Sequence, residues 1–346
     1  MGRFLIRRLL WLIPVMIVVA VITFVLMHAA PGGPFDKDPS QRQIDPTTQK
    51  QLNAQFGLDK EVWFDFPALM QGNIAGFFDT QFITYMVGGT VNGKWRCGFI
   101  CGNMGPSFRQ RGLMVQDIVL DPPEGKAPWD SKAGYSLRLG FIALIFATLI
   151  GIPMGVISAL RQNTPVDYAS LFIATSGVTV PNFVLGIFLI IIFAVGLKLV
   201  PVVPRSWDNP IVWILPAVVL GFGLLASTAR LTRASMLEVM RQDYVRTARA
   251  KGLSQRMVVW RHMLKNALIP VVTVMGPAFA GLITGSFIIE TMFGFPGWGR
   301  QFVLAIGQRD YSMIMATTLI FALIIQIANI LVDLVYTFLD PRIKLS

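Results

Sequence analysis

Long apolar runs separated by shorter polar segments recur along this chain of 346 residues. A helix needs about 20 predominantly apolar residues to cross the hydrocarbon core of a bilayer. Six runs approach or exceed that length, at residues 9–27, 137–160, 168–197, 211–228, 268–289 and 313–338. The pattern predicts an all-α, polytopic membrane protein with six transmembrane helices.

Two of these runs contain residues that disturb helices. The second carries Gly151 and Pro153, so we expect a kink whose freed backbone groups are satisfied by neighbouring helices. The third is interrupted at Pro181 and is long enough to be tilted or broken.

The segment 31–134 lacks such runs and is rich in turn-forming residues. Helical periodicity appears at 47–56, preceded by Asp45 and Pro46 as capping residues, and strand-like alternation at 82–91. We therefore expect three parts. Residues 1–30 hold the N-terminal tip and first helix, 31–134 a small mixed domain, and 135–346 the membrane core with a charged loop at 235–268.

Composition supports the membrane assignment. Hydrophobic residues make up 54% and charged residues only 14% of the chain, and the mean hydropathy is +0.60. Soluble domains carry about 25% charged residues. Three basic residues, Arg3, Arg7 and Arg8, precede the first apolar run. Because that run is longer than a secretory h-region of about 7–15 residues, we expect an uncleaved anchor.

Charge placement predicts the orientation. Nine Lys and Arg residues lie between 230 and 265, against two acidic residues, whereas in 31–134 ten basic residues meet eleven acidic ones. Cytoplasmic loops near spans hold an excess of Lys and Arg. Both termini and the 235–268 loop are therefore expected in the cytoplasm and 31–134 outside it. The net charge of +11 then marks a cytoplasmic face that also attracts anionic lipid, and no nucleic-acid site is expected.

Both cysteines, Cys97 and Cys101, fall in the external segment. Thiols outside the cytoplasm tend to be oxidised, so the simplest interpretation is one short-loop disulfide. Two free thiols, or a metal site, are the alternatives. A metal site would need further ligands, and neither histidine is nearby in the sequence.

The basic loop has an ordered pattern. Apolar positions from Leu237 to Ala248 recur at helical spacing, Gly252 can end a helix in the left-handed conformation, and Ser254 can cap the next. The second helix is expected over 255–268, with an apolar face that includes Met257 and Trp260.

Two interpretations of this loop compete. An amphipathic pair resting on lipid headgroups would explain the charge, but such a helix gains from bulk on its apolar face. The small residues at 248–252 instead favour close approach by another protein.

The loop also resembles a known family. The segment at 243–252 reads DYVRTARAKG, which is similar to the cytoplasmic coupling (EAA) loop of binding-protein-dependent ABC transporter permeases of the oligopeptide, dipeptide and nickel family. The resemblance extends over most of the chain, through the motifs RRLLWLIP at 7–14, APGGPF at 30–35, FGLD at 56–59, GNMGPS at 102–107, GIPMG at 151–155, FPG at 295–297, RDY at 309–311 and DPR at 340–342.

The sequence departs from the family pattern in two places. Residues 246–248 are Arg-Thr-Ala where the loop's name implies Glu-Ala-Ala, so only Ala248 and Gly252 carry over directly. The region 78–101, which contains the first cysteine and ends at the second, resembles an insertion and would alter the outer face that receives a binding protein.

The resemblance implies the type I ABC importer permease fold in a bacterial inner membrane. It further implies alternating access, a homologous second permease, two ATP-binding subunits that hold the coupling loops, and an extracytoplasmic solute-binding protein. The chain itself has no phosphate-binding GxxxxGK[ST] loop, so ATP and Mg would be used by the partner subunits, with no cofactor or catalytic residue here. Oligopeptides are the first expected substrate, with dipeptides, nickel complexes or another small solute as alternatives.

Four residues are expected to couple the chain to the ATPase. Gly252 would form the left-handed turn, Ala248 would pack against the ATPase, and Tyr244 would anchor the first helix. Arg249 would meet ATPase carboxylates, with a lipid-facing charge as the alternative.

Four more residues are expected to act as gate or structural supports. Glu290 and Asp310 flank the loop around Pro296, while Asn329 and Asp333 lie one turn apart in the last run. An ionisable residue within a span is a functional candidate, but Asp333 lies near the cytoplasmic end of the run, where a structural bond or snorkelling explains it at least as well as substrate contact.

Rival functions fit less well. A secondary transporter would show an internal repeat and buried charges at mid-membrane, and neither is apparent in the sequence. A channel would not need a protein-docking corner.

Overall fold

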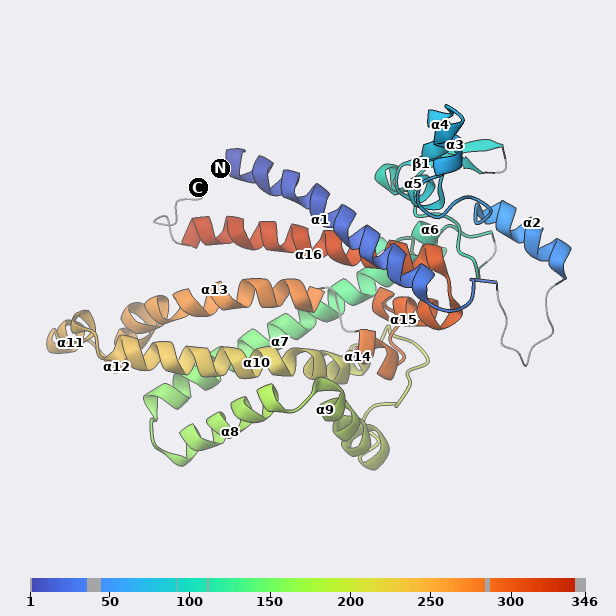
Figure 1. Cartoon of the computed structure of the whole chain (residues 1–346). Coiled ribbons are helices and arrows are strands. Elements are labelled where there is room, and N and C mark those ends of the chain that lie inside the picture. Colours follow the sequence, from blue (N-terminus) through green and yellow to red (C-terminus); the bar gives the residue numbers. More distant parts are fainter. Residues whose placement is uncertain (1, 36–44, 92, 111, 284–286, 340–346) are drawn as a thin grey trace. The chain divides into compact units, whose positions relative to one another are not determined.

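Long apolar helices dominate the protein, whose structure is a computed structural model (Figure 1). It describes residues 2–35, 45–91, 93–110, 112–283 and 287–339. Within these residues, four helices are long and apolar enough to cross a membrane, at Leu5–Ala29, Lys132–Leu160, Ile211–Met240 and Tyr311–Leu331. A bent pair of helices makes a fifth if it forms one span. The mostly helical membrane architecture predicted from the sequence is confirmed at this level.

The four long helices correspond to predicted runs. They are α1 (Gly2–Ala29), α7 (Lys132–Leu160), α10 (Ile211–Met240) and α16 (Tyr311–Leu339). Helix α7 continues through Pro153 without a break. Helix α10 extends well past residue 228, where the sequence predicted its end, because a charged residue in the extension, Arg233, has a buried partner.

The third predicted run is broken. Helix α8 (Pro165–Thr179) and helix α9 (Asn182–Leu189), which continues as a π-helix η3 (Ile190–Gly196), meet at 112°. Val180 at the junction has extended backbone angles, as expected for a residue before proline. The interruption expected at Pro181 is therefore a sharp bend.

The fifth predicted run, 268–289, corresponds to two helices. These are α13 (Leu264–Ile283) and α14 (Phe287–Met292). Residues 284–286 of the predicted span lie outside the described residues. Helix α15 (Trp298–Gln308) follows a turn.

The chain divides into two compact units. The first comprises Met1–Leu10, Tyr135–Arg300 and Ile324–Ser346, and the second Trp11–Gly134 and Gln301–Leu323. Most of α1 and the start of α16 belong to the same unit as the 31–134 segment.

Small residues bring the helices of the first unit close together. A Cβ atom at Gly155 of α7 would lie 2.5 Å from the carbonyl oxygen of Ala229 in α10. A Cβ atom at Gly221 of α10 would lie 2.6 Å from the carbonyl oxygen of Ala143 in α7, and Gly177 of α8 packs as tightly on α10. Small residues at helix interfaces are typical of membrane proteins, because they let backbones approach. Helices α7, α8 and α10 thus form one closely packed group.

The second unit contains short elements between α1 and α7. They are α2 (Pro46–Phe56), α3 (Phe66–Met70), α4 (Ile74–Phe78), α5 (Gln81–Met86), β1 (Gly88–Val91), β2 (Lys94–Cys97), η1 (Phe99–Cys101), α6 (Val115–Val119) and η2 (Pro128–Asp130). The strands pair antiparallel, with Gly88 opposite Cys97 and Val91 opposite Lys94.

The sequence predicted these short elements unevenly. Helix α2 matches the expected 47–56, with Pro46 at its start and Asp45 just before it. The strand expected over 82–91 is wrong in its first half, where α5 forms. The Thr80 hydroxyl accepts a hydrogen bond from the Ile83 amide and so caps that helix.

An apolar cluster forms the core of the second unit. It joins Phe24 of α1, Phe35, Phe56 of α2, Phe108 and Tyr311 of α16 with aliphatic side chains around them. The Phe56 and Phe108 rings meet edge to face at 4.6 Å. Aromatic contacts of this kind add to the stability gained by burying the rings.

Candidate functional site

The basic loop folds into a helical corner at one end of the first unit. Helix α11 (Asp243–Ala250) ends at a turn in which Gly252 has a φ of 76°. Ser254 then caps α12 (Gln255–Met257), because its hydroxyl accepts a hydrogen bond from the Met257 amide at 3.5 Å. The left-handed glycine and the serine cap have the conformations expected from the sequence. We call residues 243–261 the basic corner.

The helices around the corner begin and end differently from the prediction. The helix expected to run from Leu237 to Ala248 is two helices, because Gln242 has an extended backbone that separates α10 from α11. The second helix does not end near residue 268. It continues from α12 through a π-helix, η4 (Val258–Met263), into α13, so Pro270 lies inside the helix and not at its end.

The π-helical turn changes which side chains face inward. Val258, Val259 and Met263 are buried with Ala248 in one cluster. The apolar face predicted for this helix is therefore wrong at Met257 and Trp260, which are exposed, Trp260 by 65%. π-helical segments widen the turn and are frequent at functional sites. The corner thus presents a large aromatic side chain among basic residues.

The four predicted coupling residues divide into two groups. Tyr244, Arg249 and Gly252 are exposed on the corner. Ala248, expected to touch a partner directly, is only 4% exposed and packs inside this chain's own cluster. It is buried in the same cluster as Val258, Val259 and Met263.

Tyr244 is held by a residue that the sequence reasoning missed. The Asn266 side-chain amide donates a hydrogen bond to the Tyr244 hydroxyl at 2.9 Å. Asn266 lies 22 positions away on α13, so no local pattern connects the two residues. The bond ties α11 to the helix that enters the membrane core.

A buried ion pair lies behind the corner. The Arg233 guanidinium of α10 donates two hydrogen bonds to the Asp167 carboxylate of α8, at 2.7 and 2.8 Å. The same carboxylate accepts from the Ser158 hydroxyl of α7 at 2.5 Å and from the Asn163 amide at 3.0 Å. The Asp167 side chain is 1% exposed. This network, also missed from the sequence, joins α7, α8 and α10.

Glu290 is fully buried and lies against a tight turn. It accepts hydrogen bonds from the Ser136 hydroxyl at 2.7 Å and from the Arg300 amide at 3.0 Å. The Ser136 oxygen in turn accepts from the Trp298 amide at 3.1 Å. A Cβ atom at Gly297 would lie 2.3 Å from the Glu290 carboxylate. Glu290 therefore binds free amides at the start of α15, and the Phe-Pro-Gly turn leaves room for its carboxylate.

Asp310 organises a comparable site in the second unit. Its carboxylate accepts from the Met313 amide at 3.2 Å, which caps α16, and from the Phe108 amide at 3.2 Å. The Ser107 hydroxyl also donates to it. Arg109 donates to the carbonyl oxygen of Pro34 at 3.0 Å. Asp310 thus fastens the 107–109 loop to the start of α16.

The last two candidates lie on α16. Asp333 forms an ion pair with Arg8 of α1 at 2.6 Å, in agreement with the structural alternative for this residue. Asn329 is half-buried one turn earlier. The motif at 340–342 lies outside the described residues.

The two cysteines lie at the end of the hairpin. The Cα atoms of Cys97 and Cys101 are 6.0 Å apart, and their sulfur atoms are joined. This separation falls within the range of disulfides, about 4.4–6.8 Å.

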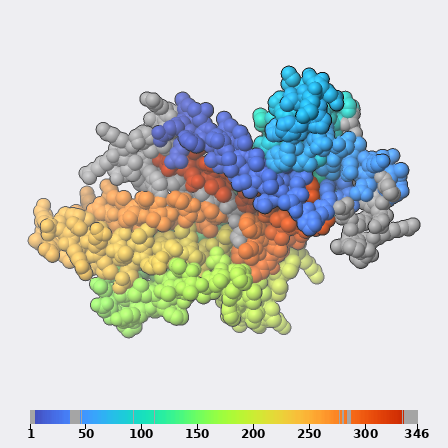
Figure 2. Space-filling model, in the orientation of Figure 1, coloured from blue at the N-terminus to red at the C-terminus, as the bar shows by residue number. Residues whose placement is uncertain are grey.

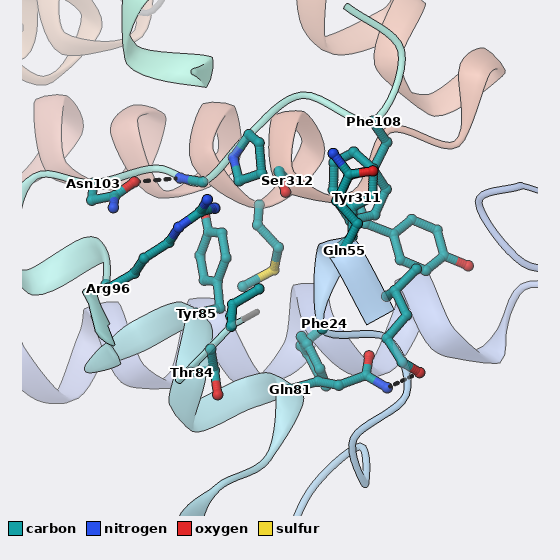
Figure 3. A pocket seen from close by; sticks show the side chains of 18 of the residues that line it. Phe24, Gln55, Gln81, Thr84, Tyr85, Arg96, Asn103, Phe108, Tyr311 and Ser312 are labelled. Atoms are coloured by element: carbon teal, nitrogen blue, oxygen red, sulfur yellow. Dashed lines mark hydrogen bonds between the residues drawn. The ribbon is translucent and has the colours of Figure 1, made fainter. Parts of the chain in front are cut away.

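A cavity of about 100 Å³ opens in the second unit (Figure 3). Phe24, Phe108 and Tyr311 form apolar walls, and the Arg96 side chain points toward the Tyr85 ring. The Tyr85 hydroxyl is buried without a hydrogen-bond partner in the described residues, and burial raises the pKa of this phenol. Ligand pockets typically have volumes of about 300–1,000 Å³. This cavity alone is too small for a bound peptide.

These observations define a class of protein. The described residues include long apolar helices, a sharply broken helix pair and an exposed basic corner. This combination is typical of a subunit of a membrane transport protein.

Comparison with known proteins identifies the family. The model of the binding-protein-dependent transport system inner membrane component matches residues 151–345, and the model of its N-terminal part matches residues 1–123. The chain belongs to this family of binding-protein-dependent transport system inner membrane components.

Relatives match over their whole length. The dipeptide transport system permease protein DppB of Bacillus subtilis is 40% identical, over 100% of this chain and 99% of its own. The oligopeptide transport system permease protein OppB of Salmonella typhimurium is 35% identical, over 99% of this chain and 100% of its own. The oligopeptide permease AppB of Bacillus subtilis is 34% identical with the same coverage. A solved structure of the MetNI methionine ABC transporter aligns with 60% of this chain and 94% of that chain, at 19% identity and a TM-score of 0.49.

Proposed function

We propose that this chain is one permease subunit of an ABC importer for peptides. The observation that carries the proposal is full-length similarity to peptide permeases, joined to an exposed basic corner at the position of the family's coupling loop. The chain forms half of the translocation pathway and a homologous permease forms the other half. It hydrolyses no ATP. Two ATP-binding partner subunits use ATP and Mg, and a solute-binding protein delivers the peptide.

The proposed topology has six spans in the bacterial inner membrane. To the four long helices and the broken α8–α9 pair it adds α13 with α14. Both termini and the basic corner lie in the cytoplasm, and residues 31–134 lie outside it. The charge distribution supports this orientation, since the Lys and Arg excess gathers around the corner.

The basic corner acts as the coupling element. Closure of the ATPase subunits pushes on α11, whose exposed Tyr244 and Arg249 lie on the docking face. Trp260 extends this face with an aromatic anchor of the kind enriched at binding hot spots. Because α12, η4 and α13 form one continuous helix, a push on the corner reaches the membrane core directly.

The substrate class is peptides, with oligopeptides as the first candidate. Similarity to a dipeptide permease at 40% identity supports dipeptides as the second. Uptake of a labelled dipeptide and a labelled pentapeptide by the assembled transporter, each competed by the other, separates the two.

The coupling role is tested at Gly252. Its φ of 76° disfavours any other residue, but a Cβ atom there would meet nothing within 4 Å. Gly252→Val should therefore keep the chain folded and inserted while it abolishes peptide-stimulated ATP hydrolysis by the assembled complex. Gly125→Val is the matched control, because Gly125 has a φ of 75°, equally open surroundings and a position far along the chain from the corner.

Two results would contradict the proposal. Normal peptide-stimulated hydrolysis in Gly252→Val would remove the coupling role of the corner. Transport at full rate by the purified chain without nucleotide would instead indicate a channel or secondary transporter.

A further inference from the structure

Two short helices with exposed apolar side chains lie between α2 and α5 in the second unit. Residues 66–78, which we call the apolar tip, contain α3, α4 and the turn between them, and no charged residue. Neither helix has a buried residue. The most exposed large apolar side chains are Met70 at 89%, Ile74 at 66% and Phe66 at 58%. In Figure 2 the light-blue segment that includes the tip projects from the surface of its unit.

Side-chain caps satisfy part of the backbone of the tip. The Asp65 carboxylate accepts from the Ala68 amide at 3.0 Å and caps α3, and the Asn73 side chain accepts from the Gly76 amide at 2.9 Å and caps α4. The Asp65 amide donates to the Phe77 carbonyl oxygen at 3.3 Å and closes the base. These bonds lower the cost of moving the capped amides out of water, because an unsatisfied backbone group is costly inside a bilayer.

The base of the tip is attached to a membrane span. Trp63 packs edge-on against Phe24 of α1 at 5.0 Å between ring centroids, and both rings contact Phe82. Phe24 is five residues before the end of α1 at Ala29, or about 7.5 Å along the helix axis at 1.5 Å per residue. Interfacial helices bury their apolar face about 5–10 Å into the boundary between headgroups and acyl chains. The base of the tip therefore packs about 7.5 Å from the end of a span along its axis, a distance comparable to that depth.

Charge separates the base from the tip. Lys60 and Asp79 form an ion pair at 2.5 Å, and Asp65 and Asp79 directly flank the uncharged residues 66–78. A protein-binding surface would carry charged or polar side chains around an apolar centre. The tip has no charged side chain, and its exposed apolar side chains are suited to contact with lipid.

We propose that the apolar tip inserts into the membrane leaflet in which α1 ends, and that Met70, Ile74 and Phe66 contact lipid acyl chains there. The tip fixes the second unit against the membrane surface. This anchoring is independent of the substrate and of the direction of transport.

The test uses the assembled transporter in lipid nanodiscs. Single cysteines introduced as Met70→Cys or Ile74→Cys are labelled with the fluorophore NBD, and the unlabelled parent protein gives the background. Lys94→Cys, exposed on β2 of the same unit, is the matched control. Phospholipid with a nitroxide at a shallow acyl position should quench most of the fluorescence at 70 and 74, with a blue-shifted emission, and little of it at 94.

Two outcomes would overturn the proposal. The first is quenching at 70 and 74 no stronger than at 94. The second is protection of 70 and 74 only after the solute-binding protein is added, which would make the tip a protein-docking site. Since quenching requires no transport activity, the result does not depend on the proposed function.

Discussion

Replacing Arg233 with glutamine removes the partner of a buried carboxylate. The Arg233 guanidinium makes two hydrogen bonds with Asp167, whose side chain is 1% exposed, while its own side chain is 19% exposed. Without the guanidinium, the carboxylate keeps the hydroxyl of Ser158 and the amide of Asn163 but has no countercharge. Breaking a buried pair by removing one partner costs about 3–5 kcal/mol.

A second arginine–aspartate pair in the same chain provides a control for the size of this destabilisation. Arg8 also pairs with an aspartate, Asp333, but its side chain is 46% exposed. Exposed ion pairs contribute about 0–1 kcal/mol. Arg8→Gln should therefore lower the free energy of unfolding only slightly, although both variants remove one arginine.

The measurement is unfolding of each variant in micelles by denaturant titration, followed by tryptophan fluorescence. Asp167→Asn and the double variant complete the cycle. We expect each single change at the buried pair to be strongly destabilising, and the double variant to cost less than their sum by about 0.5–3 kcal/mol. A cost for Arg233→Gln no larger than that for Arg8→Gln would refute the reasoning.

Two further predictions concern Gly297 and the cysteines. Gly297→Ala places a methyl group on the Glu290 carboxylate and should cost about 1–3 kcal/mol of stability, measured by thermal unfolding. Gly307→Ala, in α15 with nothing within 4 Å, should be neutral or stabilising, and an equal loss in both would contradict the packing argument. Non-reducing mass mapping of membranes should recover Cys97 and Cys101 in a linked peptide, whereas recovery of both as free thiols would exclude the bond.

Local signals in the sequence predicted local structure well. Apolar length located α1, α7, α10 and α16. Gly252 and Ser254 indicated a helix end and a helix start, because left-handed backbone and side-chain capping act over a few residues. Pro181 indicated the break between α8 and α9, because a proline constrains the backbone of the residue just before it.

Contacts between distant residues could not be predicted in this way. The apolar run was expected to end at residue 228, yet α10 continues to Met240, and its Arg233 pairs with Asp167, 66 residues earlier. The inward face after Ser254 was misjudged because the π-helical turn shifts the periodicity on which the prediction relied. Glu290 and Asp310 were selected as supports, but nothing in the sequence paired them with Ser136 and Ser107, which lie more than 150 positions away.

The close packing of α7, α8 and α10 has a consequence for motion. Where glycine brings one backbone into contact with the next, a sliding or rotating helix would collide with its neighbour within a fraction of an ångström. The Asp167 network pins the same three helices at one end. This trio therefore has few internal degrees of freedom and should move as one body, so the hinges of a transport cycle belong at its borders. Distances between spin labels within the trio would then stay constant in every state.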